Sequence, residues 1–229
     1  ADILEAVGVN IFADADRVKE CIESIGIGFM FAPLFHPAMK FAVAPRKEIG
    51  IRTVFNLLGP LTNPARAEAQ LMGVYGVQLT EKIAKVLKGL GTKRAMVVHG
   101  MDGLDEISNI GKTRISELKG RRIKTFTVTP ETFGVRSGNV DEIRGYDAER
   151  NALMLLRLLK GEDNALRDMV LMNAAGAIMT GGLTNSWRDA MKISAESIDS
   201  GSAYEKLELL VEVSGGELQK LRRLEEHVR

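Results

Sequence analysis

Two neighbouring carboxylates, Asp105 and Glu106, are the side chains of this sequence whose type and spacing best suit chemistry. They lie in the Gly-containing segment HGMDGLDEIS, 99–108, directly after the apolar stretch 95–98. That stretch predicts a buried strand of a parallel sheet. Ligands of open α/β sheets bind beyond the carboxyl ends of such strands, and Mg²⁺ is usually held by one or two carboxylates together with substrate phosphates. The pair therefore predicts either a magnesium site on a phosphate or an ordinary solvated acidic turn.

A second group of residues suits the binding of a small organic anion. It lies in the segment HPAMKFAVAPRKEIGIRTVFNLLGPLTNP, 36–64. The guanidinium of Arg46 could donate two parallel hydrogen bonds to a planar carboxylate, and His36 could stack on the same ligand or bond to it. The residues alone equally allow Arg46 as a surface charge and His36 as the start of a helix. Gly59 and Pro60 could wall a pocket or simply end a helix.

Other reactive residue types form no catalytic arrangement in this sequence. There is no GxSxG motif, no Cys–His pairing and no Cys/His cluster, so nucleophilic hydrolysis and zinc chemistry lack support. Asp102 is a third candidate ligand, although an aspartate before a glycine is typical of a turn. His99 is expected to be structural. The single cysteine, Cys21, is expected in the core and fits a reducing compartment.

Composition and charge narrow the class of protein. The 229 residues are 45% hydrophobic and 27% charged, which is ordinary for a globular protein. The formal net charge of +1 argues against a dedicated nucleic-acid surface. No apolar run approaches the roughly 20 residues that cross a bilayer, and no signal peptide is visible. We therefore expect no membrane association and a cytoplasmic location.

Strand-like and helix-like segments alternate along the chain, which predicts an α/β architecture. We expect Asp14, Thr80 and Asp163 to be helix N-caps. The apolar stripe of the last helix is expected to face a core. Helices are expected at 2–8, 15–24, 37–49, 52–58, 81–90 and from Asp163 to Met179. Strands are expected at 26–31, 71–75, 95–98 and in the segments TRISEL and IKTFTV.

The two motif segments resemble the matching parts of anthranilate phosphoribosyltransferases. The resemblance rests on FHPAMKFAVAPRKEIGIRTVFNLLGPLTNP and on VVHGMDGLDEIS. The opening ADILEAVGVNI is similar to the helix that follows the SGSAD-type motif of that family. The resemblance becomes weaker toward the C-terminus but covers essentially the whole chain.

This resemblance implies a reaction and a set of roles. The family transfers the phosphoribosyl group of phosphoribosyl diphosphate to anthranilate and releases pyrophosphate, in tryptophan biosynthesis. Carried over by position, Arg46 would hold the anthranilate carboxylate, and His36, Gly59 and Pro60 would line its pocket. Asp105 and Glu106 would be the ligands of Mg²⁺ on the pyrophosphate. No side chain is expected to act as a nucleophile, because positioning and the metal would suffice.

The family also implies a fold, a domain division and an oligomeric state. The fold is a central mixed sheet flanked by helices, of nucleoside phosphorylase and phosphoribosyltransferase type, with a remnant of a small helical domain. Residues 1–35 would begin the α/β domain, 36–62 would belong to the helical domain and 63–229 would form the α/β catalytic domain. The GTGGD-type, KHGNR-type and Ser-rich segments of the family do not occur in this sequence. We therefore expect a C-terminal portion of an enzyme that is a homodimer at full length, and the sequence leaves open whether this portion is active alone.

Two alternative functions use the same architecture. A pyrimidine nucleoside phosphorylase is one, although its substrate motifs are absent and the GLDE segment argues against it. A non-enzymatic nucleic-acid binder is the other, and the even charge argues against it because such binders rely on a basic surface.

Overall fold

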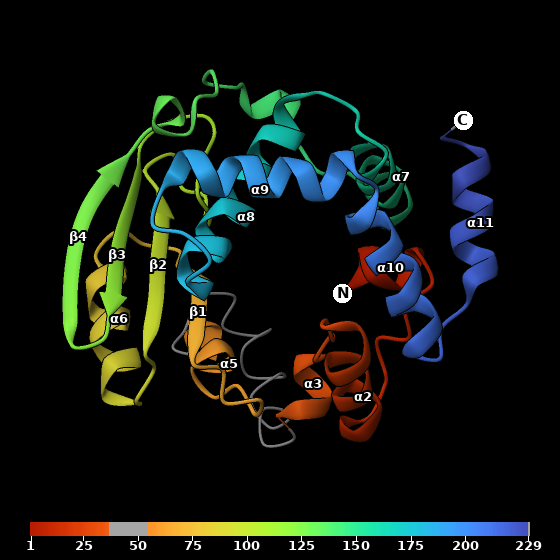
Figure 1. Ribbon diagram of the computed structural model, residues 1–229, viewed down its shortest axis with the longest axis horizontal. Helices are drawn as coiled ribbons and strands as arrows, with labels where there is room; N and C mark the ends of the chain where they lie inside the picture. The colour runs from red at the N-terminus through yellow and green to blue at the C-terminus, as the bar shows by residue number, and fades with distance from the viewer. Residues whose placement is uncertain (37–54, 229) are drawn as a thin grey trace, which may run out of the picture. The chain divides into compact units, whose positions relative to one another are not determined.

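The computed structural model describes residues 1–36 and 55–228 and groups them into two compact units (Figure 1). The first unit comprises the described residues of Ala1–Gly59, Gly145–Glu162 and Ser197–Arg229. The second comprises Pro60–Arg144 and Asp163–Glu196. The predicted helix over 37–49 lies outside the described residues. The predicted helical domain over 36–62 lies largely outside them, and that domain division stays a prediction.

The described part of the first unit is helical. Its helices are α1 (Asp2–Ala6), α2 (Ala15–Ile25), α3 (Ala32–Phe35), α7 (Ala148–Leu159), α10 (Ser202–Val213) and α11 (Leu218–Glu226). Two further helices, α5 (Phe55–Leu61) and α9 (Trp187–Asp199), have residues in both units.

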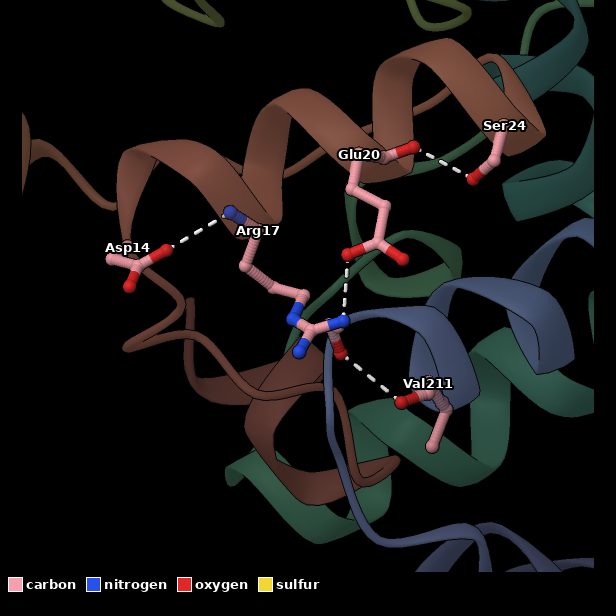
Figure 2. Close-up of polar contacts among 6 residues, drawn as sticks. Asp14, Arg17, Glu20, Ser24 and Val211 are labelled. Atoms are coloured by element: carbon pink, nitrogen blue, oxygen red, sulfur yellow. Dashed lines mark hydrogen bonds and ion pairs between the residues drawn. The ribbon is translucent and has the colours of Figure 1, made fainter.

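The start of α2 confirms the predicted N-cap. The Asp14 carboxylate accepts a hydrogen bond of 2.9 Å from the backbone N–H of Arg17, as Figure 2 shows. This bond satisfies one of the N–H groups that the first turn of a helix leaves unpaired. Arg17 also forms an ion pair with Glu20, one turn further along the same helix.

Apolar stripes of several helices meet in the core of the first unit. The predicted core stripe of the last helix is confirmed, since Leu221 is fully buried and Leu224 nearly so. The buried residues of this core are Val7, Val9, Cys21, Ile25, Ala152, Leu156, Leu207, Leu210, Val211, Leu221 and Leu224.

The predicted strand over 26–31 is wrong. This stretch has no strand or helix and is exposed or half-buried throughout. Its aromatic residues pack on one another instead of joining a sheet, with the rings of Phe29 and Phe31 stacked at 6.4 Å and Phe12 edge-on to Phe31 at 5.5 Å. Apolar runs of this length do not by themselves distinguish a strand from a packed loop.

The second unit is built on a four-stranded mixed sheet. Its strands are β1 (Ala69–Gly73), β2 (Arg94–Gly100), β3 (Thr113–Lys119) and β4 (Arg122–Val128), and they lie side by side in that order. β1 and β2 are parallel, whereas β2, β3 and β4 are antiparallel neighbours. The four strands predicted within 71–128 are confirmed, although β1 lies two residues earlier than expected.

Helices cover both faces of this sheet (Figure 1). On one face, Met96 and Val98 of β2 share a core with Met172 and Ala175 of α8 (Ala165–Gly181). The other face is covered by α6 (Leu79–Gly89), which packs on β2 and β3. Because successive side chains of a strand point to opposite faces, this arrangement explains why β2 is apolar without alternation.

Three helix boundaries differ from prediction. Thr80 is not the cap of α6: it lies within the helix, and its hydroxyl donates backward to the Val77 carbonyl at 3.1 Å. The N-cap of α8 is Asn164, one residue after the expected Asp163, because either residue type caps well. The helix expected to stop at Gly59-Pro60 continues to Leu61.

Pro60 is the next-to-last residue of α5, and because it has no N–H, one helical backbone hydrogen bond is missing at this end of the helix. Its carbonyl accepts a hydrogen bond of 2.9 Å from the side chain of Gln70 in β1.

Among the described residues, no helix has the length and apolar character needed to cross a bilayer.

Candidate functional site

The acidic pair lies in the loop 101–112, which joins β2 to its antiparallel neighbour β3. Asp105 and Glu106 are exposed, whereas the next residue, Ile107, is completely buried. The burial of Ile107 anchors the loop in the core of the second unit. The two carboxylates are thereby presented to solvent from a segment whose neighbouring backbone is fixed.

Ser108 organises the rest of this loop. It is 1% exposed, and its backbone N–H donates to the hydroxyl of Thr113 at 2.9 Å. Its own hydroxyl donates to the Asp102 carboxylate and accepts from the Ile110 N–H at 3.0 Å. Asp102 also accepts from the backbone N–H of Leu104 at 3.1 Å. These bonds make Asp102 a turn former, as its sequence context indicates.

Gly73, the last residue of β1, fixes the position of Asp105. A Cβ atom at Gly73 would overlap the backbone carbonyl of Asp105. Only glycine permits this approach of one backbone to another. The acidic loop therefore lies at the carboxyl end of β1, which is where open α/β sheets bind their ligands.

A helix from later in the chain holds the other side of the loop. The side-chain oxygen of Asn173 in α8 accepts from the Ile107 N–H, and its side-chain nitrogen donates to the Ile107 carbonyl, both at 2.9 Å. A second bond runs from the loop to the helix: the side-chain nitrogen of Asn109 donates to the carbonyl of Ala165, the first residue of α8, at 2.7 Å. The loop and α8 are thus joined by amide side chains from both sides.

The electrostatics of the pair favour a bound cation. Loss of hydration, and then the adjacent Asp105 carboxylate, raise the pKa of Glu106. Two carboxylates crowded in this way repel each other, and a divalent cation relieves that repulsion. The described residues include no group of three or more His, Cys, Asp or Glu side chains placed to hold a metal ion. Two carboxylates suit Mg²⁺, which usually keeps several waters and takes further oxygens from phosphates.

Of the predicted anion-binding residues, His36 is described and Arg46 is not. His36 is half-buried and ends α3, with its N–H donating to the Ala32 carbonyl at 3.0 Å. It therefore follows a short helix, and the helix expected after it lies outside the described residues. Arg46 also lies outside them, so its role stays a prediction.

Gly59 and Pro60 lie next to each other in α5. A methyl group added at Gly59 would meet no atom within 4 Å. Pro60 is exposed and borders a recess of about 490 Å³ together with Asn63, Arg66 and Gln70. The recess contains neither His36 nor Gly59, so the predicted pocket for the organic anion stays a prediction.

Pro60 and the acidic pair lie near different ends of β1. Pro60 is bonded to Gln70, the second residue of the strand, whereas Asp105 packs on Gly73, the last. Three residues of strand separate these positions by roughly 10 Å. The second unit does not bring them together at one point, so a ligand contacting both would have to be extended.

His99 is structural, as expected. It is 7% exposed, and its Nδ1 lies 2.7 Å from the Val74 carbonyl. A carbonyl can only accept, so Nδ1 carries the proton in this bond. The bond ties the end of β2 to the residue that follows β1.

Sequence reasoning missed three residues that shape the acidic loop: Gly73, Asn109 and Asn173. Gly73 carries a usable signal, because a glycine at the end of a strand often marks a close backbone approach. Asn173 carries a weaker one: an asparagine within an apolar helix must find partners for its amide. Nothing in the sequence indicates that those partners belong to Ile107.

Comparisons of this chain with known protein families, sequences and structures agree with one another. Residues 1–204 match the model of a glycosyl transferase family described by its α/β domain. An anthranilate phosphoribosyltransferase of Methanocorpusculum labreanum is 51% identical over 216 residues, which are 94% of this chain and 63% of that protein.

Solved structures agree with the sequence comparison. The anthranilate phosphoribosyltransferase of Thermus thermophilus has a TM-score of 0.86 and 41% identity, over 93% of this chain and 64% of that one. The enzyme of Saccharomyces cerevisiae in complex with PRPP and Mg has a TM-score of 0.84 and 30% identity, over 93% of this chain and 62% of that one. The chain thus spans less than two thirds of these relatives. Because the family model covers most of its length, the chain belongs to the glycosyl transferase family and contains that family's α/β domain.

Proposed function

We propose that this chain is the α/β part of an anthranilate phosphoribosyltransferase. Such an enzyme transfers the phosphoribosyl group of phosphoribosyl diphosphate to anthranilate and releases pyrophosphate. The observation that carries the proposal is the acidic loop, in which Asp105 and Glu106 are exposed next to a fully buried residue. The similarity to the yeast enzyme, whose structure contains PRPP and Mg, supports it.

Asp105 and Glu106 are proposed to hold Mg²⁺ on the pyrophosphate group. When bound, the metal neutralises the charge that develops on the leaving pyrophosphate. The protein contributes two carboxylates on a loop that Gly73 and Asn173 hold in place. Their mutual repulsion provides a reason for a cation to bind here.

The acceptor side is proposed to be built by Arg46, His36, Gly59 and Pro60. Arg46 would hold the anthranilate carboxylate through a two-pronged hydrogen bond. His36, Gly59 and Pro60 would line the pocket for the ring. The anthranilate amine is the nucleophile, so no covalent protein intermediate is needed and positioning contributes most. The separation of Pro60 from the acidic pair along β1 suits two substrates bound end to end.

A homodimer at full length and a cytoplasmic location complete the proposal. A buried, unpaired Cys21 is compatible with a reducing compartment. Sedimentation of the full-length protein would test the dimer.

Two measurements test the proposed function. The first follows the loss of anthranilate fluorescence when the chain is mixed with phosphoribosyl diphosphate and Mg²⁺, and a loss that needs all three components supports the reaction. The second is calorimetric titration of phosphoribosyl diphosphate at fixed Mg²⁺ with Asp105→Asn, which is expected to bind at least tenfold more weakly. The matched control is Glu68→Gln, an exposed carboxylate paired with Lys93 before β1.

Each outcome has a defined meaning. Equal affinities of Asp105→Asn and Glu68→Gln would exclude the acidic pair as the metal site. Anthranilate affinity unchanged in Arg46→Ala would exclude the proposed acceptor site. Phosphate-dependent release of a base from a nucleoside would favour a nucleoside phosphorylase, and salt-sensitive retention of DNA or RNA in a gel would favour a nucleic-acid binder.

A further inference from the structure

Asn173, in the middle of α8, forms hydrogen bonds with the backbone of the acidic loop. It is half-buried, and the hydrogen bonds of its side-chain amide all go to backbone atoms. The oxygen accepts from Ile107, and the nitrogen donates both to Ile107 and to Met169, each at 2.9 Å. A side chain that bonds both the N–H and the C=O of one residue holds the two peptide groups that flank that residue, here the one before Ile107 and the one after it.

One of the two peptide groups that Asn173 holds is the one that follows Glu106. The N–H of Ile107 belongs to the peptide plane that includes the Glu106 carbonyl, so the bond to Asn173 sets the backbone torsion next to Glu106. Among the described residues, Glu106 makes no side-chain hydrogen bond or ion pair, so the placement of its carboxyl depends on its backbone and on its own rotamers. Asp105, by contrast, is held from the other direction by Gly73.

Packing supports the same contact. The Ile107 side chain is completely buried and lies over Gly176 of α8, where a Cβ atom would come within 2.7 Å of it. Asn173 and Gly176 are three residues apart and therefore share one face of the helix. One face of α8 thus receives both the backbone and the side chain of Ile107.

We infer that Asn173 is a positioning residue of the proposed metal site, acting through the peptide between Glu106 and Ile107. The inference rests on the proposed function, because it needs Glu106 to be a metal ligand. Outer residues that orient metal ligands change metal affinity by about 10- to 100-fold when removed. Loss of the Asn173 amide is expected to weaken metal binding without removing any ligand.

The test is a Mn²⁺ titration of the chain, with the free ion measured by electron paramagnetic resonance. Mn²⁺ replaces Mg²⁺ because it takes the same oxygen ligands. Asn173→Leu removes all three amide bonds at similar volume. Asn173→Asp is the second variant, and it keeps an acceptor for the Ile107 N–H while losing both donors. The control is Ser194→Ala, which removes a buried hydroxyl that bonds the Leu171 carbonyl of α8 without contacting the loop.

Asn173→Leu is expected to weaken Mn²⁺ binding about tenfold, and Asn173→Asp to weaken it less, whereas Ser194→Ala leaves it unchanged. Because Asn173 acts through Glu106, the double variant Asn173→Leu/Glu106→Gln is expected to bind no more weakly than Glu106→Gln alone. Hydrogen exchange at the Ile107 amide should accelerate in Asn173→Leu, which removes its acceptor, but less in Asn173→Asp and not in Ser194→Ala.

The possible failures are distinguishable. A wild-type chain that does not bind Mn²⁺, or a Glu106→Gln variant that binds it normally, would overturn the metal site and this inference together. Weakening by Glu106→Gln without weakening by either Asn173 variant would overturn the inference alone. Effects that multiply in the double variant would show that Asn173 acts independently of Glu106, which also overturns it.

Discussion

The backbone of Asp105 packs directly on the Cα atom of Gly73, so the acidic loop and the end of β1 touch without any intervening side chain. This contact places a carboxylate pair from one connection of the sheet at the carboxyl end of a neighbouring strand. The two carboxylates, which could bind a ligand, therefore lie at the edge of the sheet where α/β proteins bind theirs.

Gly73→Ala is expected to destabilise the second unit and to displace the acidic loop. The added Cβ has no room, and the obstacle is backbone, which cannot rotate away as a side chain can. We expect a loss of about 1–3 kcal/mol or more in the free energy of unfolding, as for other overpacked sites, together with weaker Mg²⁺-dependent binding of phosphoribosyl diphosphate. Urea denaturation and calorimetry measure the two effects. Gly89→Ala, a glycine in α6 with no atom within 4 Å of the added group, is the control and should leave both unchanged or slightly improved.

Ser108→Ala is expected to cost about 2–3 kcal/mol of stability, since it leaves the Ile110 N–H and the Asp102 carboxylate without the hydroxyl that bonds them. Thermal denaturation would show this as a lower melting temperature. Ser24→Ala, an exposed serine that bonds only the Glu20 carbonyl of its own helix, should change stability by less than about 0.5 kcal/mol. Equal losses in the two variants would contradict the role given to Ser108.

Gly59→Ala is expected to separate a pocket role from a structural one. The site has space for a methyl group, and alanine favours a helix by up to about 1 kcal/mol over glycine, so stability should hold or rise. If Gly59 lines the acceptor pocket, the KM for anthranilate rises while the KM for phosphoribosyl diphosphate does not change. An unchanged KM for anthranilate would remove Gly59 from the proposed pocket.

The Glu225 carboxylate is expected to make the free energy of unfolding of the first unit depend on pH in the acidic range. Burial alone would raise its pKa, but hydrogen bonds from Arg222, Tyr204 and Lys160 outweigh burial and lower the pKa to about 2. Because the folded pKa lies below the unfolded value of 4.5, this stabilisation is complete above about pH 5 and disappears as the pH falls toward 2.

Glu225→Gln tests that dependence. It is expected to be less stable than the wild type at pH 7, by at most about 3 kcal/mol, with the difference closing between pH 5 and 2. Urea denaturation at a series of pH values measures it. Glu23→Gln, an exposed carboxylate in a 3.8 Å pair with Lys19, is the control. A difference between Glu225→Gln and wild type that stays constant with pH would contradict the role of Glu225.

Local patterns predicted much of this fold. Asp14 could be recognised as an N-cap because its carboxylate, three residues before the N–H it bonds, needs no distant partner. The apolar run of β2 likewise indicated a buried strand, whereas the mixed character of the sheet was implied only by the family resemblance. Both motif segments resemble anthranilate phosphoribosyltransferases, and the comparisons confirm that similarity.

Predictions failed where a residue has two physically equivalent uses. Thr80 can bond forward as a cap or backward to the Val77 carbonyl, and the second occurs. The aromatic run ending at Phe31 can pair in a sheet or pack on itself, and it packs on Phe12 and Phe29. The partners of Asn173 and Gly73 could not be derived because they lie far away in the sequence, at Ile107 and Asp105 respectively.

The bond between Asn173 and Ile107 also has a consequence for the order of folding. The hairpin of β2 and β3 closes over a short connection, whereas the two residues of this bond are 66 positions apart. Closing the longer segment costs more chain entropy, so contacts of this range form after local ones. The turn that carries Asp105 and Glu106 therefore begins as part of a hairpin and receives its final shape only when α8 docks, late in the assembly of the second unit.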